Sequence, residues 1–199
     1  LLGMLSVATL LLAPALPDQK LHVHFLDIGQ GDGILIETPS GRQMLIDGGK
    51  DAQQLFDQLA AVLPWWDRRV DVVLLTHPDG DHMWAQESLT QRYEVGLAQI
   101  TSIGRASVDS HAWLQSLAAQ QSSVSIQEAG GKIDLGDGVV LDVLWPPPGG
   151  FDPAVAQDTD DHVDTSFDNE NGIVMRLVYG SFSVLLTADI GIPSEQALL

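Results

Sequence analysis

One segment decides the fold of this chain: Val70-Asp71-Val72-Val73-Leu74-Leu75-Thr76-His77-Pro78-Asp79-Gly80-Asp81-His82. Val72–Leu75 is a short apolar run that begins with two valines, which is typical of a buried strand. Pro78 and Gly80 end the strand and predict a tight loop. The loop holds two imidazoles and two carboxylates, which are ligand types of divalent transition metals. The alternative is an acidic turn with two incidental histidines, but four possible ligands after a buried strand favour a metal site.

The composition predicts one acidic domain. The 199 residues are 45% hydrophobic, which is enough for one sizeable core. The chain has no cysteine, which excludes disulfides and thiolate metal sites. Its net charge of −18, from 27 acidic and 9 basic residues, disfavours loose electrostatic binding of nucleic acid. A bound cation reverses the local electric field, so the negative net charge does not exclude a nucleic-acid substrate at a metal site. Adaptation to salt is another explanation of the acidity.

The first 16 residues differ from the rest of the chain. Leu1–Leu16 contains no charged residue and is rich in Leu and Ala, although it is shorter than the roughly 20 residues that span a bilayer. No basic stretch precedes it, unlike in a signal peptide, and it is apolar on all faces, unlike an amphipathic helix. We therefore expect residues 1–17 to be the end of a transmembrane helix, residues 18–20 a linker and residues 21–199 one domain.

Apolar periodicity and turn residues predict the order of the remaining elements. Strands are expected at Leu21–Asp27, Gly33–Thr38, Gln43–Ile46, Val72–Leu75 and Val95–Ile103, and in two hairpins, Lys132–Leu135 with Val139–Leu144 and Ile173–Val178 with Ser181–Thr187. Helices are expected at Ala52–Leu63, Met83–Thr90, Val108–Gln121 and Ile192–Leu199. The Asp-rich segment Gly149–Glu170 predicts a mobile surface loop. His22 and His24 are expected to face solvent.

The motif at residues 77–82 resembles the metal-binding motif of the metallo-β-lactamase fold, His-x-His-x-Asp-His. Asp79 stands in place of the second His. That replacement, with Pro78 after the first His, resembles the soluble domain of the bacterial DNA-uptake competence channel, the ComEC family. Asp-Ile-Gly-Gln-Gly-Asp at 27–32 and Leu-Ile-Asp-Gly-Gly at 45–49 resemble the opening of that domain, in the expected order. The resemblance implies an α/β fold, an αβ/βα sandwich truncated at its C-terminus.

The resemblance also implies a site with two divalent metal ions, manganese or zinc. The implied ligands are His77, Asp79, Asp81, His82 and Asp189, with Asp189 bridging both ions. Asp81 is in addition the expected catalytic residue, because it is suited to orient the nucleophile or accept its proton. Asp79 makes the first site harder than one built from imidazoles alone, which favours manganese. Two such ions lower the pKa of a shared water and neutralise the oxygens of a phosphodiester.

Further polar residues are candidates around this site. Asp47, at the end of the neighbouring strand, is expected to hold a ligating His by a hydrogen bond. Asp32 is expected either to support the site in the same way or to stabilise its own turn. Three residues compete for the place of one more ligand: His162, which lies 27 residues before Asp189 (189 − 162), Asn169 and Asn171. The family's downstream His-His-Gly block is not in the sequence, so we expect this piece alone to be a poor enzyme.

The function that the resemblance implies is metal-dependent hydrolysis of phosphodiesters. The implied substrate is DNA, in single-stranded form, and the implied location is the bacterial inner membrane, with other DNA-uptake proteins as partners. Two alternatives stay open. One is a membrane-tethered metallo-hydrolase with a small ester, lactam or nucleotide substrate. The other is a catalytically silent metal-binding domain that gates or scaffolds the channel.

Overall fold

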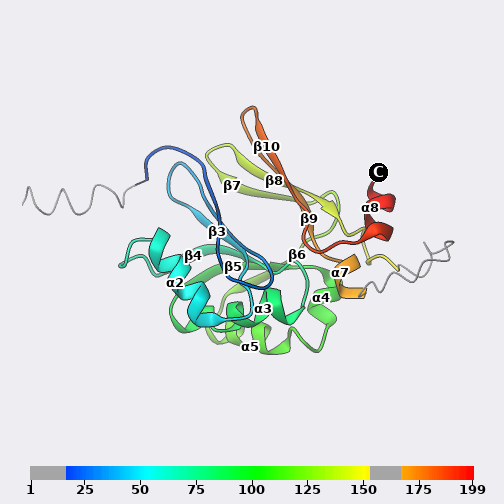
Figure 1. Cartoon of the computed structure of the whole chain (residues 1–199), viewed down its shortest axis with the longest axis horizontal. Helices are drawn as coiled ribbons and strands as arrows, with labels where there is room; N and C mark the ends of the chain where they lie inside the picture. The colour runs from blue at the N-terminus through cyan, green and yellow to red at the C-terminus, as the bar shows by residue number, and fades with distance from the viewer. Residues whose placement is uncertain (1–16, 153–166) are drawn as a thin grey trace, which may run out of the picture.

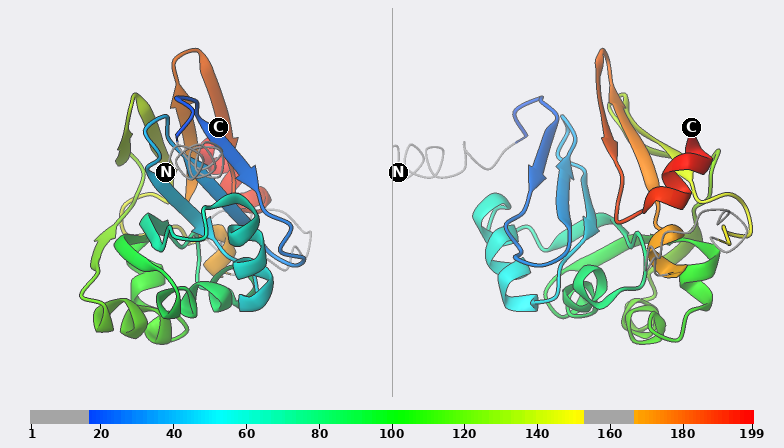
Figure 2. Two further views of the ribbon diagram at one scale, coloured as in Figure 1. Left: turned by 90° about the vertical axis from the view of Figure 1, so that its left-hand side faces the viewer. Right: turned by 45° about the vertical axis from the view of Figure 1, so that its right-hand side comes forward.

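The structure is a computed structural model that describes residues 17–152 and 167–199. Two β-sheets face each other, and helices cover the outer face of the larger sheet (Figure 1, Figure 2). The larger sheet contains β1 (His22–Phe25), β2 (Gly33–Glu37), β3 (Gln43–Asp47), β4 (Arg69–Leu74), β5 (Glu94–Ile100) and β6 (Ser123–Ile126), in that order. The smaller sheet has the order β10-β9-β8-β7, with β7 (Lys132–Gly136), β8 (Val139–Trp145), β9 (Val174–Tyr179) and β10 (Phe182–Leu186). The α-helices are α2 (Ala52–Val62), α3 (Gly80–Glu87), α4 (Ser102–Ala106), α5 (His111–Ala119), α7 (Phe167–Glu170) and α8 (Ile192–Leu198). This arrangement confirms the predicted α/β sandwich.

The predicted buried strand is β4, which lies in the middle of the larger sheet. Val73 and Leu75 pack on the side of α2, α3 and α5, whereas Val72 and Leu74 pack toward the smaller sheet. A strand covered on both faces has no polar side, which explains the continuous apolar run. Burying each such side chain stabilises the fold by about 1.5–3 kcal/mol.

Strand directions bring the candidate residues to one edge of the larger sheet. Strands β1 and β3 both run antiparallel to β2, and β4 runs parallel to β3, with Met44 opposite Val72 and Ile46 opposite Leu74. The carboxyl ends of β1, β3 and β4 therefore lie at the same edge. The starts of these strands, with the turn between β2 and β3, lie at the opposite edge.

Two predicted boundaries are wrong, one because of a helix that was not expected and one because a helix begins earlier than expected. The strand expected over Val95–Ile103 ends at Ile100, where the Thr101 hydroxyl accepts a hydrogen bond from Gly104 N (2.8 Å) and starts α4. The helix expected from Met83 begins at Gly80, so Asp81 and His82 lie in its first turn and not in a loop. The side chains of Asp81 and His82 therefore project from a regular helical backbone.

Three further expectations are corrected. Strand β6 was not expected, because its Ser-Val-Ser-Ile sequence carries only two apolar residues. The end of the segment expected as a loop, Phe167–Glu170, forms α7. His22 lies at the surface, as expected, and pairs there with Asp18 (2.9 Å), whereas His24 is partly buried, with its Nε2 3.0 Å from Glu37.

Two expectations fall on residues that the structure does not describe. Leu1–Leu16, expected as a transmembrane segment, and the candidate ligand His162 lie outside residues 17–152 and 167–199. Within those two ranges, no helix combines the length and the apolar composition needed to cross a bilayer.

Candidate metal centre

A buried carboxylate, Asp47, joins three parts of the chain at the edge of the sheet. Asp47 ends β3 in a left-handed conformation (φ 53°) and is completely buried. It accepts hydrogen bonds from Thr76 N (2.8 Å) and Thr76 Oγ1 (2.7 Å), in the segment that follows β4. It also accepts one from His82 Nδ1 (2.9 Å), in the first turn of α3. The end of β3 thus fixes the orientation of a histidine on another element.

The same carboxylate sets the tautomer of both histidines. A carboxylate only accepts, so the single proton of the Thr76 hydroxyl goes to Asp47. The contact of 2.9 Å between Thr76 Oγ1 and His77 Nδ1 must then have His77 as its donor. His82 Nδ1 likewise donates to Asp47. Both rings therefore carry a proton on Nδ1, and both leave Nε2 to meet a ligand.

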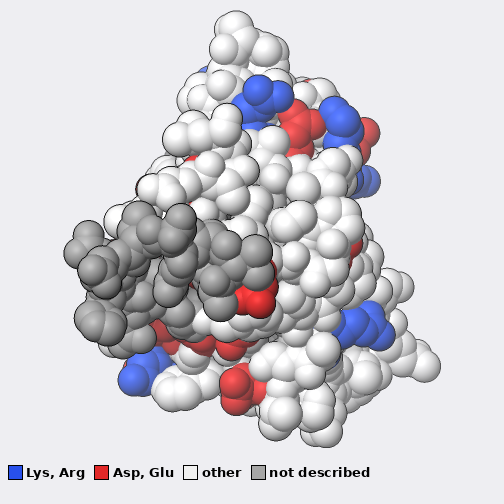
Figure 3. Space-filling model, turned by 90° about the vertical axis from the view of Figure 1, so that its right-hand side faces the viewer, with Lys and Arg blue, Asp and Glu red and all other residues white. Residues whose placement is uncertain are grey.

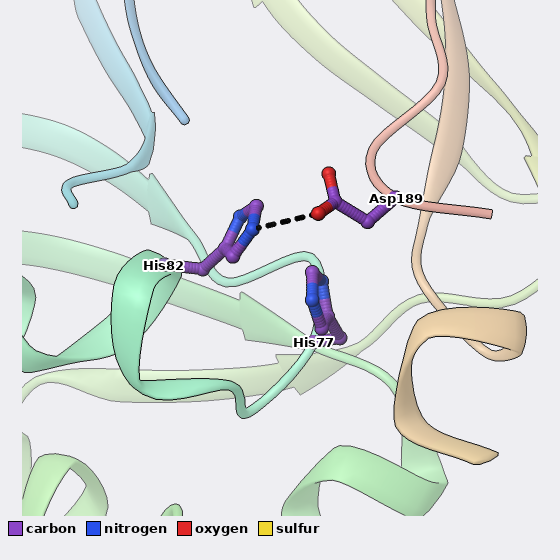
Figure 4. A group of neighbouring side chains, drawn as sticks. All are labelled: His77, His82 and Asp189. Carbon is purple, nitrogen blue, oxygen red and sulfur yellow. Dashed lines mark ion pairs between the residues drawn. The ribbon is translucent and has the colours of Figure 1, made fainter. Parts of the chain in front are cut away.

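The two Nε2 atoms and the Asp189 carboxylate face one another (Figure 4). The rings of His77 and His82 lie 4.1 Å apart between centroids, and His82 Nε2 lies 3.4 Å from Asp189 Oδ2. Both Nε2 atoms are buried, and neither makes a hydrogen bond to any residue in the described parts of the chain. One ligand atom from each of the three residues falls within 4.8 Å of the others. Orphaned buried nitrogens are costly, and a divalent cation would satisfy them, so the residues fit a metal ion.

A second group of possible ligands shares His82 with the first. Asp32, Asp47 and His82 also offer atoms within 4.8 Å of one another. Asp47 is already held by three donors, so it supports the site and does not serve as a free ligand. Asp32, in the glycine-rich turn before β2, is partly exposed and extends the acidic lining of the site.

Charge interactions at the site are strong. Burial lowers the pKa of His82, but the carboxylates of Asp189 and Asp47 outweigh it and raise that pKa to about 10. Burial and the neighbouring His82 lower the pKa of His77. The contact with His82 lowers the pKa of Asp189, whereas burial and Asp47 raise the pKa of Asp32. Without a metal ion, a proton on His82 balances the carboxylates, and a divalent cation would replace it.

Two predicted ligands lie beside the cluster and outside both groups. Asp79, the residue before α3, has its Oδ2 3.8 Å from His77 Nε2. Asp81 turns its carboxylate toward Gln30, whose Nε2 donates to Asp81 Oδ2 (3.1 Å). Neither belongs to a group of three possible ligands within the described residues. Their roles as ligands, and that of Asp81 in catalysis, stay predictions.

The asparagine candidates differ in how their side chains are used. Asn171 accepts a hydrogen bond from Phe151 N (2.6 Å) and donates to the carbonyl oxygens of Phe151 (2.9 Å) and Phe167 (2.9 Å). These bonds fasten the chain before β9, so the structure uses Asn171 as a loop support. Asn169 Oδ1 is buried and has no hydrogen-bond partner in the described part of the chain. Asn169 is thus the freer of the two.

Sequence reasoning missed two residues that support the site. Thr76 links the two histidines through Asp47. The sequence pattern that could have identified it is a hydroxyl residue between a buried strand and a histidine. Glu170 is completely buried and accepts hydrogen bonds from Ser194 N (3.0 Å) and Ser194 Oγ. This bond ties α8, which follows Asp189, to α7. No local pattern predicts it, because the partners are 24 residues apart.

Comparisons with known proteins agree with this geometry. The model of the family described as "Metallo-beta-lactamase superfamily" matches residues 26–199. The comparison with curated proteins gave no match.

Solved structures that resemble the chain share its fold. Zinc-bound PqqB from Methylobacterium extorquens has a TM-score of 0.52 and 16% identity, over 78% of this chain and 48% of its own. A metallo-beta-lactamase from Cronobacter sakazakii has a TM-score of 0.54 and 16% identity, over 92% and 67%. CmlA from Streptomyces venezuelae, a diiron β-hydroxylase, has a TM-score of 0.50 and 18% identity, over 87% and 30%. The chain thus spans about half of PqqB and less than a third of CmlA.

Proposed function

Because the chain belongs to the metallo-beta-lactamase superfamily, whose model matches residues 26–199, we propose that it is a metal-dependent phosphodiester hydrolase acting on DNA. The observation that supports this most is the group of His77, His82 and Asp189 at the edge of the sheet. The motifs at residues 27–32, 45–49 and 77–82 favour a domain of a bacterial DNA-uptake competence protein. In this proposal, residues 1–17 attach the domain to the inner membrane, and single-stranded DNA reaches it from other uptake proteins.

The residues of the chain prepare the site before any ligand arrives. Asp47 and Thr76 fix both imidazoles with Nε2 directed at Asp189, so little reorganisation is needed on binding. A bound divalent ion, manganese or zinc, would polarise a phosphodiester and lower the pKa of a coordinated water. Asp79 and Asp81, at the partly exposed start of α3, are next to this cluster and are proposed as further ligands of a site for two ions, with Asp79 beside His77.

The acidity of the protein makes DNA binding depend on cations. With a net charge of −18, the surface repels a polyanion. On the face shown in Figure 3, acidic side chains lie near the middle and also beside the Lys and Arg at the upper end. A metal centre is then the local positive charge that a phosphate would meet. We therefore expect DNA binding to require the metal ion.

One observation favours a second candidate, a hydrolase of small esters or lactams. A cleft of about 140 Å³ lies beside Asp32 and Thr76, between the two sheets. Its lining combines the polar residues Asp32, Thr76 and Thr187 with several large apolar side chains: Phe25, Ile34, Ile46, Ile173, Met175, Leu185 and Leu186. A small substrate with one apolar and one polar part would fit a cleft of this size and lining better than a sugar-phosphate chain does.

The two candidates separate in one assay. The protein is loaded with manganese or zinc and given single-stranded DNA, a small ester and a lactam. We expect DNA cleavage that Asp189→Asn removes and that Asp57→Asn, on the exposed side of α2, leaves unchanged. Cleavage of only the ester or the lactam would establish the second candidate. Stoichiometric metal without any hydrolysis would establish a catalytically silent domain and overturn the proposal.

A further inference from the structure

Two neighbouring tryptophans lie exposed in the segment between α2 and β4. Trp65 is 78% exposed and Trp66 is 41% exposed, and their rings meet edge to face with centroids 5.5 Å apart. Leaving this much indole in water forgoes a large hydrophobic stabilisation. An exposed aromatic pair of this kind indicates a surface that contacts something else.

The pair lies beside the point where the described chain begins. Pro17 and Trp66 line the same groove of about 620 Å³, between β1 and the C-terminal end of α2. Pro17 also lies against the turn between β2 and β3, since a Cβ on Gly41 would come within 2.7 Å of Pro17 Cγ. The 16 residues before Pro17 carry no charge. The apolar segment therefore joins the domain next to Trp66.

Strand directions place this groove and the metal centre at opposite edges of the larger sheet. The start of β1, the turn between β2 and β3 and the segment before β4 lie at one edge. The ends of β3 and β4, with Asp47 and His77, lie at the other edge. The five residues of β3 separate the edges by about 15 Å. In Figure 1 the start of the described chain and α2 both lie on the left of the molecule.

We propose that Trp65 and Trp66 contact the lipid headgroup region of the bilayer that holds residues 1–16, and so orient the metal centre away from the membrane. The proposal rests on the membrane attachment proposed above. An indole ring combines a large apolar face with one N–H donor, which suits the boundary between lipid and water. At this edge Lys20 pairs with Asp18, and Arg69 pairs with Asp71 and Glu94, so the contact with headgroups depends on the tryptophans.

The test uses lipid quenching of tryptophan fluorescence in the whole chain. The protein is reconstituted in vesicles of phosphatidylcholine brominated near the headgroup end of its acyl chains. One variant, Trp84→Phe, keeps the exposed pair Trp65 and Trp66. The other, the double variant Trp65→Phe/Trp66→Phe, keeps Trp84. Trp84 is 49% exposed and lies on α3 beside the metal centre, so it is the matched control. Trp113 and Trp145 are buried in both variants.

We expect brominated lipid to quench a several-fold larger share of the fluorescence in Trp84→Phe than in the double variant. Equal quenching, or stronger quenching in the double variant, would overturn the orientation. If the fluorescence of the pair changed with protein concentration and did not depend on lipid bromination, the pair would contact another copy of the chain. That result would also overturn the proposed orientation. The measurement needs neither metal nor DNA. Quenching of the pair in a protein that does not cleave DNA would therefore uphold this inference while the proposed function fails.

Discussion

Asp47 accepts three hydrogen bonds from two residues, and through them it orients both histidines of the cluster. A negative charge with no exposure to water is stable there only because each donor points at it. At the scale of single residues, the site therefore depends on a side chain whose oxygens are already bonded to Thr76 and His82. Its removal should be felt both in folding and in metal binding.

We predict that Asp47→Asn weakens metal binding by about 10–100-fold. Asparagine has the same shape as aspartate, but its terminal NH2 group is a hydrogen-bond donor. This donor would face another donor, on Thr76 or His82. The same clash should lower the free energy of unfolding by about 1–3 kcal/mol. Calorimetric titration with zinc or manganese and urea unfolding measure the two effects. Asp57→Asn is the control and should change stability by less than about 0.5 kcal/mol. Unchanged metal affinity in Asp47→Asn would show that the orientation of His82 does not matter.

We predict that Asp81→Ala abolishes hydrolysis and costs less than about 1 kcal/mol of stability in the metal-free protein. Asp81 is partly exposed and bonds only to Gln30 among the described side chains, and its loss removes one of several neighbouring carboxylates. Leu74→Ala, in the core of β4, should instead cost about 2–5 kcal/mol with or without metal. Thermal unfolding with and without manganese, next to a nuclease assay, distinguishes the two. An active Asp81→Ala protein with a normal metal-induced rise in Tm would contradict the catalytic assignment.

At the scale of elements, the glycine-rich turn before β2 touches the start of α3. Gly31 has a φ of 87°, and a Cβ there would lie 1.6 Å from the carbonyl oxygen of Asp81. Only glycine lets the turn approach the helix so closely. The contact also brings Gln30 to Asp81.

Gly31→Ala should therefore be more harmful than an ordinary glycine substitution. Gly138→Ala is the matched control, because Gly138 has a similar φ of 81° but no atom within 4 Å of its Cβ position. We expect the control to lose about 1 kcal/mol, from backbone strain alone. Gly31→Ala should lose at least about 2 kcal/mol more and should bind metal more weakly, as the turn moves off α3. Urea unfolding and metal titration of both variants test this, and equal losses would mean that the contact is unimportant.

Sequence reasoning recovered what local pattern determines. The run Val72–Leu75 identified the central strand, and the His-x-x-x-x-His spacing identified the two histidines that meet. It could not show that Asp81 pairs with Gln30, 51 residues away, because this depends on which turn packs on which helix. It also missed β6, whose two apolar residues do not distinguish a strand from a loop. Local propensity predicts elements, whereas contacts between distant segments decide where charged side chains point.

At the scale of the whole molecule, the opposing pKa shifts of the two histidines make stability depend on pH. The pKa of His82 rises from 6.5 to about 10, so its favourable contribution is complete below about pH 6.5 and is lost as the pH approaches 10. The pKa of His77 is lowered, so its contribution weakens as the pH falls below about 6.5.

We therefore predict that the metal-free protein becomes less stable as the pH rises from about 7 to about 10. Urea midpoints measured across this range in the presence of a chelator provide the test. In His82→Gln the decline should be much smaller, because the shifted group is gone. A wild-type midpoint that stays constant or rises over this range would contradict the balance between His82 and its carboxylates.

During synthesis, the two histidines of the centre are made well before Asp189. The scaffold of both histidines, from β3 to α3, lies within residues 43–87, whereas Asp189 follows His82 by 107 residues (189 − 82). At ribosomal speeds of about 5–20 residues per second, Asp189 is synthesised roughly 5–20 s later. A nascent chain thus presents two imidazoles without the carboxylate that faces them. A metal ion held by all three residues, as proposed above, can therefore bind only after synthesis has passed β10.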